Sequence, residues 1–296
     1  NTQSYGTTNQ RVVRDIAQGS ATKLSMSEVD GSWQSGGFDP FNENFSNGLG
    51  MAGKINSDVY ALQSKDFTFW QIVEDLYNMS TGSSDINGNA AKIKGENTNW
   101  GTVLIDFDCT VAGKDGKLYS ERTWLNNGKS TQGIAPCTVL ANSKYNAVRA
   151  YTKFVHKGDR VIANSSTTDN FTATSQDGKV QTLIHRNTSD HTQTLVVDLS
   201  RYGNIAQNAF GTAYLTTAPR ALDSQLGATI SYLNKFSNVK QPSNAVVIDA
   251  KNKTATVAIP AKSIMSIQLS GISGVAHEAA AVQDNEFYQI IGKQSR

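Results

Sequence analysis

The sequence contains no apolar run of about 18 residues, the length that a membrane-spanning helix needs. An excess of one charge sign is also missing, because charged residues make up 18% of the chain and its formal net charge is +2. Attraction to a nucleic acid or to an anionic membrane surface requires a larger excess of Lys and Arg. We therefore predict no nucleic-acid partner and no membrane span.

Potential metal ligands are few. The 4 histidines are dispersed, and no Cys or His pair has the spacing of a metal site. We predict neither a metal nor another cofactor. The cysteines, Cys109 and Cys137, flank a loop-rich segment and are expected to form a disulfide in an oxidising compartment. Such a bond would stabilise the fold by roughly 3 to 4 kcal/mol, whereas the alternative is two unrelated buried thiols.

A carboxylate at the end of a short alternating segment is the first indication of chemistry. Residues 23–28 alternate in polarity, Glu28 ends them, and a Gly-Ser turn leads to Trp33. Sugar-cleaving barrels present their catalytic carboxylates at such strand ends. The alternative is a surface glutamate in front of a loop.

The segments after Glu28 predict a strand–helix–strand unit. A helix is expected over residues 47–63, and a second strand over 66–71 carries Trp70 near its end. The buried face of the helix follows from spacings of three and four residues. It consists of Leu49, Ala52, Ile55, Val59 and Leu62. A parallel crossover of this kind brings both strand ends to one edge of a sheet.

The first residues predict one more strand and helix. Tyr5 would stand at the end of a strand, and Thr7 or Thr8 would cap the helix that follows. We expect this helix to turn its apolar residues inward, namely Val12, Val13 and Ile16. These strands alone cannot close a barrel, which needs eight strands and typically about 250 residues.

Four motifs, taken in order, resemble glycoside hydrolase family 30. They are residues 27–32 (SEVDGS), 69–75 (FWQIVED), 99–101 (NWG) and 144–155 (KYNAVRAYTKFV). Within that family the motifs are most similar to those of bacterial galactan endo-1,6-β-galactosidases. The similarity covers about residues 1–273.

The resemblance implies roles for individual residues. In family 30 the nucleophile ends barrel strand seven, a Trp ends strand eight, and the last barrel helix leads into a side β-sandwich. By this similarity Glu28 is the nucleophile and Trp70 a platform that stacks against a sugar. Tyr5 and Trp33 are further candidates for substrate binding, although packing in the core or a loop is the alternative for an aromatic residue.

The resemblance also points to something missing. The family's general acid is a Glu in an Asn-Glu pair on barrel strand four, and no residue before Glu28 can supply it. We therefore expect the acid to lie in a missing N-terminal half of the same protein. The polar composition agrees with a secreted or cell-surface bacterial protein.

After residue 158 the hydrophobic period changes from helical to alternating. A helix is predicted over residues 144–156, with one side formed by Tyr145, Val148, Tyr151 and Val155. Short alternating strands follow, as is typical of a β-sandwich. They are residues 160–163, 171–174, 180–184, 194–199, 213–216, 245–248, 254–259 and 264–269.

The predicted fold is thus α/β plus all-β. Residues 1–158 would form the C-terminal strands and helices of a (β/α)8 TIM barrel, and residues 159–273 an antiparallel β-sandwich. Residues 274–296 would be a linker and the start of a lectin-like domain, because their last segment resembles the first strand of a trefoil lectin. The sandwich shows no catalytic constellation. A group near one strand end is interpreted as a solvated loop: His185, Arg186, Asp190 and His191.

Two function classes follow. The first is a retaining endo-glycoside hydrolase of a β-linked polysaccharide, in which Glu28 attacks the anomeric carbon. The choice of β-1,6-galactan rests on the resemblance alone. The second is a non-catalytic carbohydrate-binding or cell-surface module, which the sandwich and the absent acid would both permit. A polysaccharide or oligosaccharide is the expected ligand in either case.

Overall fold

The protein was studied as a computed structural model, which describes residues 7–29, 33, 45–75, 101–105, 139–141, 143–217, 239–240 and 245–275. Its helical segments are α1 (Thr7–Gly19), α2 (Ser46–Ser57), the π-helical turn η1 (Asp58–Leu62) and α4 (Ser143–Thr152). Within these ranges, no helix combines the length and the apolar character that crossing a membrane requires. Cys109, Cys137, Tyr5 and residues 276–296 lie outside the described residues, so the disulfide and lectin-like segment stay predictions.

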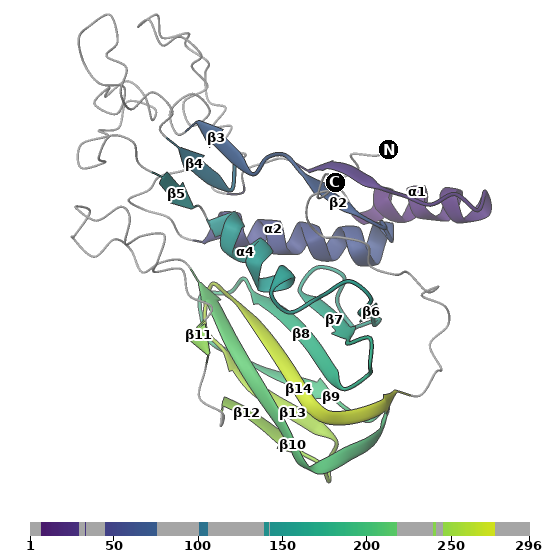
Figure 1. Cartoon of the computed structure of the whole chain (residues 1–296), viewed down its shortest axis with the longest axis vertical. Coiled ribbons are helices and arrows are strands. Elements are labelled where there is room, and N and C mark those ends of the chain that lie inside the picture. The colour runs from purple at the N-terminus through teal and green to yellow at the C-terminus, as the bar shows by residue number, and fades with distance from the viewer. Residues whose placement is uncertain are drawn as a thin grey trace, which may run out of the picture.

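The strand–helix–strand unit predicted around Glu28 is present. Strands β1 (Met26–Val29) and β2 (Phe67–Phe69) pair in parallel, and α2 with η1 connects them. Figure 1 shows α2 running beside this strand pair. The expected apolar face of α2 is confirmed, because Leu49, Ala52 and Ile55 are all buried.

A small sheet follows directly after β2. Strands β3 (Val73–Asp75) and β4 (Val103–Ile105) pair in parallel, and β4 pairs antiparallel with β5 (Val139–Ala141). Strand β5 leads into α4, whose first residue contacts the first turn of α2. The N–H of Gly48 donates a hydrogen bond of 2.9 Å to Oγ of Ser143. The two helices therefore start side by side.

The second half of the chain forms two antiparallel sheets, as the alternating pattern predicted. A six-stranded sheet has the order β11-β10-β14-β8-β7-β6, and a three-stranded sheet has the order β12-β13-β9. The strands are β6 (Arg160–Val161), β7 (Asn170–Thr174), β8 (Val180–Asn187), β9 (Gln193–Asp198), β10 (Tyr202–Thr217), β11 (Val239–Lys240), β12 (Val246–Asp249), β13 (Thr254–Ile259) and β14 (Ser263–Val275).

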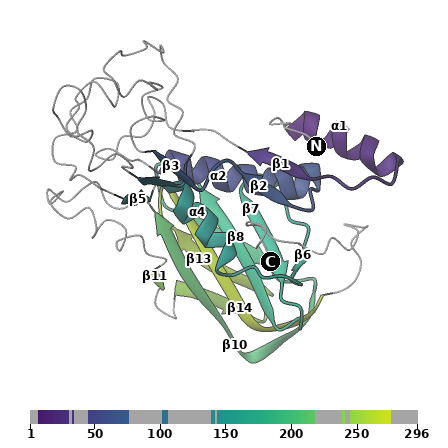
Figure 2. The same ribbon diagram turned by 45° about the horizontal axis from the view of Figure 1, so that its top comes forward.

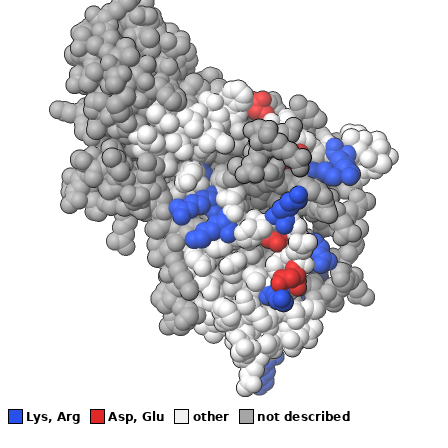
Figure 3. Space-filling model, in the orientation of Figure 1, with Lys and Arg blue, Asp and Glu red and all other residues white. Residues whose placement is uncertain are grey.

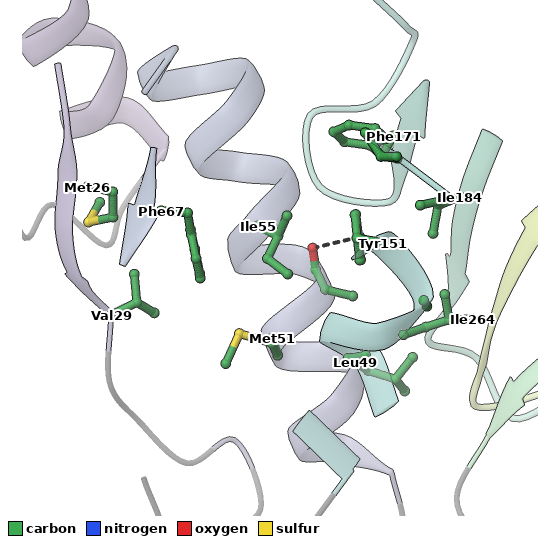
Figure 4. Close-up of a cluster of buried hydrophobic side chains, with 14 of the residues drawn as sticks. Met26, Val29, Leu49, Met51, Ile55, Phe67, Tyr151, Phe171, Ile184 and Ile264 are labelled. Carbon is green, nitrogen blue, oxygen red and sulfur yellow. Dashed lines mark hydrogen bonds between the residues drawn. The ribbon is translucent and has the colours of Figure 1, made fainter. Parts of the chain in front are cut away.

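The six-stranded sheet is covered on both faces. Because successive side chains of a strand point to opposite faces, alternate residues belong to two different cores. On β8, Ile184 belongs to a core shared with α2 and α4, whereas Leu183 belongs to a core shared with the three-stranded sheet. Strand β14 repeats the division with Ile264 and Met265. Figures 2 and 4 show α2 and α4 over one face of this sheet, with β1 and β2 on the other side of α2.

Two helices are rotated relative to the sequence prediction. On α1, Val12 and Ile16 are 53% and 68% exposed, so their predicted burial is wrong. Gln10 and Ala17 are buried instead. The side-chain amide of Gln10 donates a hydrogen bond to the carboxylate of Asp58, so this side of α1 faces η1. On α4, Tyr145 is 41% exposed, whereas the predicted core residue Tyr151 is buried. Val155, which was also predicted for this helix, is buried but lies after its end at Thr152.

An ion pair lies inside the helical layer. Nζ of Lys54 is 2.6 Å from Oδ1 of Asp58, and their side chains are 6% and 0% exposed. Gln10 of α1 also bonds this carboxylate and accepts a hydrogen bond from Ser57. Burial raises the pKa of Asp58 from 3.8 to about 6, even though Lys54 acts to lower it.

This raised pKa predicts how stability depends on pH. Because the folded pKa lies above the unfolded one, the folded state binds more protons between pH 3.8 and about 6. The contribution of Asp58 to the free energy of unfolding is therefore full below this window and lost as the pH rises through it, by about 3 kcal/mol. In urea unfolding at several pH values, Asp58→Asn should remove this change. Parallel curves for the two proteins would contradict the assignment.

Candidate functional site

Glu28 lies where the parallel pair β1–β2 has an extra residue. Met26 pairs with Phe67 and Val29 with Phe69, so β1 advances by one residue more than β2 between these pairs. Such a bulge changes the direction of side chains and breaks strict alternation. Met26 and Val29 are consequently both buried, whereas Glu28 between them is only part-buried. The bulge thus leaves a carboxylate accessible near the end of a strand with a buried apolar frame.

Trp70 stands beside Glu28 on the neighbouring strand end. The N–H of Trp70 donates to the carbonyl oxygen of Val29 at 2.7 Å, which continues the ladder between the strands. Because paired strands are about 4.8 Å apart, the backbones of Glu28 and Trp70 are neighbours. The side chain of Trp70 is 49% exposed, and its peptide bond to Gln71 is cis. The structure thus places an exposed indole at the strand end next to the one that carries Glu28.

Trp33 belongs to the same region but packs against helix α2. Its N–H donates to Oδ1 of Asn47 at 2.7 Å. A Cβ built on Gly50 would lie 2.1 Å from Cγ of Trp33, so the indole occupies the space that a side chain at position 50 would take. Trp33 is part-buried, which leaves an edge for a ligand while helix α2 fixes the ring. Its predicted part in substrate binding stays a prediction.

A buried cation lies near the end of β2, and the sequence interpretation missed it. Lys144 is fully buried, and its Nζ lies 5.6 Å from the centre of the Phe69 ring. Phe69 directly precedes Trp70. The motif that contains Lys144 was assigned to a helix, and a lysine in the first turn of a helix gives no sign of burial. A fixed positive charge within the protein favours anionic groups near it.

Charged side chains of both signs lie on the surface. On the face seen in Figure 3, basic side chains occur at separate places, with acidic ones beside some of them. Within the described ranges, no group of three or more His, Cys, Asp or Glu residues is arranged to hold a metal ion. The described residues of the site are the carboxylate of Glu28, the aromatic side chains of Trp70 and Trp33, and the buried Lys144 beside Phe69.

Comparison with known proteins gives one strong similarity. The chain is 59% identical over 298 residues to an exo-β-1,6-galactobiohydrolase of Bifidobacterium longum subsp. longum. The alignment covers 100% of this chain but only 19% of that relative, so the chain spans about a fifth of its length. The 59% identity agrees with the similarity to glycoside hydrolases seen in the motifs. The chain is thus similar along its whole length to part of a glycoside hydrolase. No protein-family model matches it.

Solved structures similar to this chain are also glycosidases, but they are distant. The catalytic domain of a GH30 xylanase C from Talaromyces cellulolyticus has 14% identity, a TM-score of 0.46, and coverage of 84% of this chain and 41% of that one. An α-L-arabinofuranosidase from Thermotoga maritima has 11% identity, a TM-score of 0.47, and coverage of 88% and 46%. At these values the assignment rests on the sequence relative.

The structure thus brings together some of the residues predicted for the site. Glu28 and Trp70 lie at adjacent ends of parallel strands, and Trp33 packs on the helix between those strands. Tyr5 lies outside the described residues. Lys144 and the bulge at Glu28 are additions from the structure.

Proposed function

We propose that this chain carries the nucleophile of a retaining glycoside hydrolase that acts on β-1,6-galactan. The observation that carries the proposal is the part-buried Glu28 in a strand bulge, one ladder position from the exposed Trp70. The identity to an exo-β-1,6-galactobiohydrolase supports the substrate class. Because a polysaccharide does not cross a membrane, we propose that the protein is secreted or bound to the bacterial cell surface.

In the proposed architecture, this chain carries one part of the catalytic apparatus. Residues 1–158 would be the C-terminal strands and helices of a TIM barrel, and residues 159–273 its side β-sandwich. Residues 274–296 would begin a further, lectin-like domain. In a retaining enzyme, two carboxyl groups about 5 to 5.5 Å apart act as nucleophile and as general acid and base. We propose that the second, the general acid, comes from sequence outside this chain.

In the proposed mechanism Glu28 attacks the anomeric carbon while the acid protonates the departing oxygen. The bond to the leaving group breaks, and a galactosyl ester forms on Glu28. Water, deprotonated by the former acid, then hydrolyses that ester and regenerates both carboxyl groups. Trp70 would stack on the apolar face of a galactose ring and hold it over the carboxylate.

The mode of attack on the polymer is a separate question. The motifs predict endo action, whereas the name of the Bifidobacterium longum relative specifies exo action and a galactobiose product. The high identity to that relative favours the exo mode, which we propose here. Product analysis early in the digestion of β-1,6-galactan separates the modes: galactobiose alone from the start supports exo action, and a range of longer oligosaccharides supports endo action.

A covalent trap tests the nucleophile directly. The whole protein is treated with a galactoside that carries fluorine at C2 and a good leaving group, which slows hydrolysis of the ester. Mass spectrometry of peptides should then find one added fluorogalactosyl group on Glu28. A label on another carboxylate would move the nucleophile elsewhere. Tight binding of galactan with neither labelling nor turnover would favour the non-catalytic carbohydrate-binding module.

A further inference from the structure

Helix α2 contains glycines at positions where neighbouring groups come very close. A Cβ on Gly50 would collide with Trp33, and a Cβ on Gly53 would lie 2.2 Å from Nη1 of Arg186. Positions three residues apart are neighbours on a helix surface. Trp33 and Arg186 therefore rest on adjacent turns of the same helix, although they come from different parts of the chain.

Arg186 reaches α2 from strand β8 of the six-stranded sheet. Its Nη1 donates a hydrogen bond of 2.8 Å to the carbonyl oxygen of Leu49, and its Nε donates one of 3.0 Å to Oδ1 of Asp169. The planar guanidinium holds both acceptors in fixed directions, which a flexible ammonium group does not do. The side chain is only 17% exposed. The interpretation of Arg186 as part of a solvated loop is therefore wrong.

The turn that Arg186 bonds is also the turn that holds Trp33. Leu49 lies between Asn47, which accepts the hydrogen bond from the N–H of Trp33, and Gly50, which receives the indole. Trp33 follows Glu28 by five positions. A shift of this turn would consequently move Trp33.

We propose that Arg186 is a positioning residue for the candidate active site. It fixes the first turns of α2 relative to the six-stranded sheet, and α2 in turn fixes Trp33 beside the substrate. This inference rests on the proposed function for its kinetic consequence. Its structural consequence, the placement of Trp33, is independent of any activity.

The first test replaces Arg186 with Met in the whole protein, which keeps an unbranched apolar stem and removes both donors. We expect the KM for β-1,6-galactooligosaccharides to rise about tenfold while kcat changes less than about threefold, because binding geometry is lost and the nucleophile stays. Acrylamide should also quench Trp33 more strongly. The Trp33 signal is obtained by subtracting the fluorescence of matching proteins with Trp33→Phe. Arg186→Lys, which can still donate to Leu49, should lie in between.

A second variant separates positioning from loss of stability. Gly53→Ala keeps arginine at position 186, but the new Cβ displaces its guanidinium from α2. Ala also favours a helix more than Gly does. It should raise KM and the quenching of Trp33 as Arg186→Met does, without lowering the melting temperature. The matched control is Lys262→Met, which breaks a cation contact with Asp190 on the antiparallel part of the chain, far from α2 in sequence.

Unchanged KM and unchanged Trp33 quenching in a folded Arg186→Met or Gly53→Ala protein would overturn the proposal. An increase in Trp33 quenching of similar size in Lys262→Met would also overturn it, because the effect would then be a general loosening. If the whole protein hydrolyses no galactan, the proposed function fails. The Trp33 quenching then still decides whether Arg186 holds this region in place.

Discussion

Glu28→Gln in the whole protein is expected to lower kcat on β-1,6-galactan by about 10³-fold or more while folding stays unchanged. The amide has nearly the shape of the carboxylate but cannot attack the anomeric carbon. Since Glu28 is part-buried in a strand bulge whose frame is Met26 and Val29, the apolar contacts are kept. Initial rates and circular dichroism measure the two effects.

The matched control for this variant is Asp66→Asn. Asp66 is exposed, stands just before β2, and accepts a hydrogen bond from Ser25 at the opposite end of the parallel pair. Its replacement also removes one carboxylate beside the same strand pair, and it should leave kcat within about twofold of the wild-type value. Activity of Glu28→Gln within tenfold of the wild type would end the assignment of Glu28 as the nucleophile.

Lys54→Met is expected to be the most destabilising of the substitutions considered, by about 3 to 5 kcal/mol at pH 7. Lys54 and Asp58 are both buried, so removal of the ammonium group leaves Asp58 either charged without its counterion or forced to bind a proton. Urea unfolding measures the free energy. The surface pair Lys262–Asp190 is the control, and Lys262→Met should cost less than about 1 kcal/mol.

The double variant Lys54→Met, Asp58→Leu tests the cause of this loss. If the penalty comes from an uncompensated buried carboxyl group, replacing both ions with apolar groups should recover most of the stability. A double variant as unstable as Lys54→Met would show that the side chains act through packing or through Gln10 instead.

Local sequence patterns predicted the elements well, because each pattern reports on neighbours along the chain. The helix over residues 47–63 and the strands after residue 158 follow from periods of 3.6 and 2 that one buried face imposes. The buried face of α1 was mispredicted because Gln10 donates a hydrogen bond to Asp58, which lies 48 positions away in the sequence. No local rule makes a glutamine more buried than Val12 and Ile16.

The candidate site shows the same limit. Glu28 and Trp70 could be proposed as site residues because polar and aromatic residues at strand ends, and the motifs around them, are visible in the sequence. The bulge that leaves Glu28 accessible depends on the register between β1 and β2, which only the folded pair defines. Arg186 has the same character, since its acceptor is the backbone of Leu49, a group present at every position of every sequence.

The glycines of helix α2 have a consequence for engineering the protein. Each glycine lowers the intrinsic preference for a helix by roughly 0.5 to 1 kcal/mol relative to Ala, and Gly48, Gly50 and Gly53 stand within two turns. Helix α2 should therefore be weakly helical on its own and form only when groups from both flanking layers are present. A cut near residue 158 would yield fragments that do not fold separately. A chimera that exchanges the antiparallel sheets between relatives must keep Arg186 and Gly53 matched, because the guanidinium of Arg186 occupies the space that a side chain at position 53 would need.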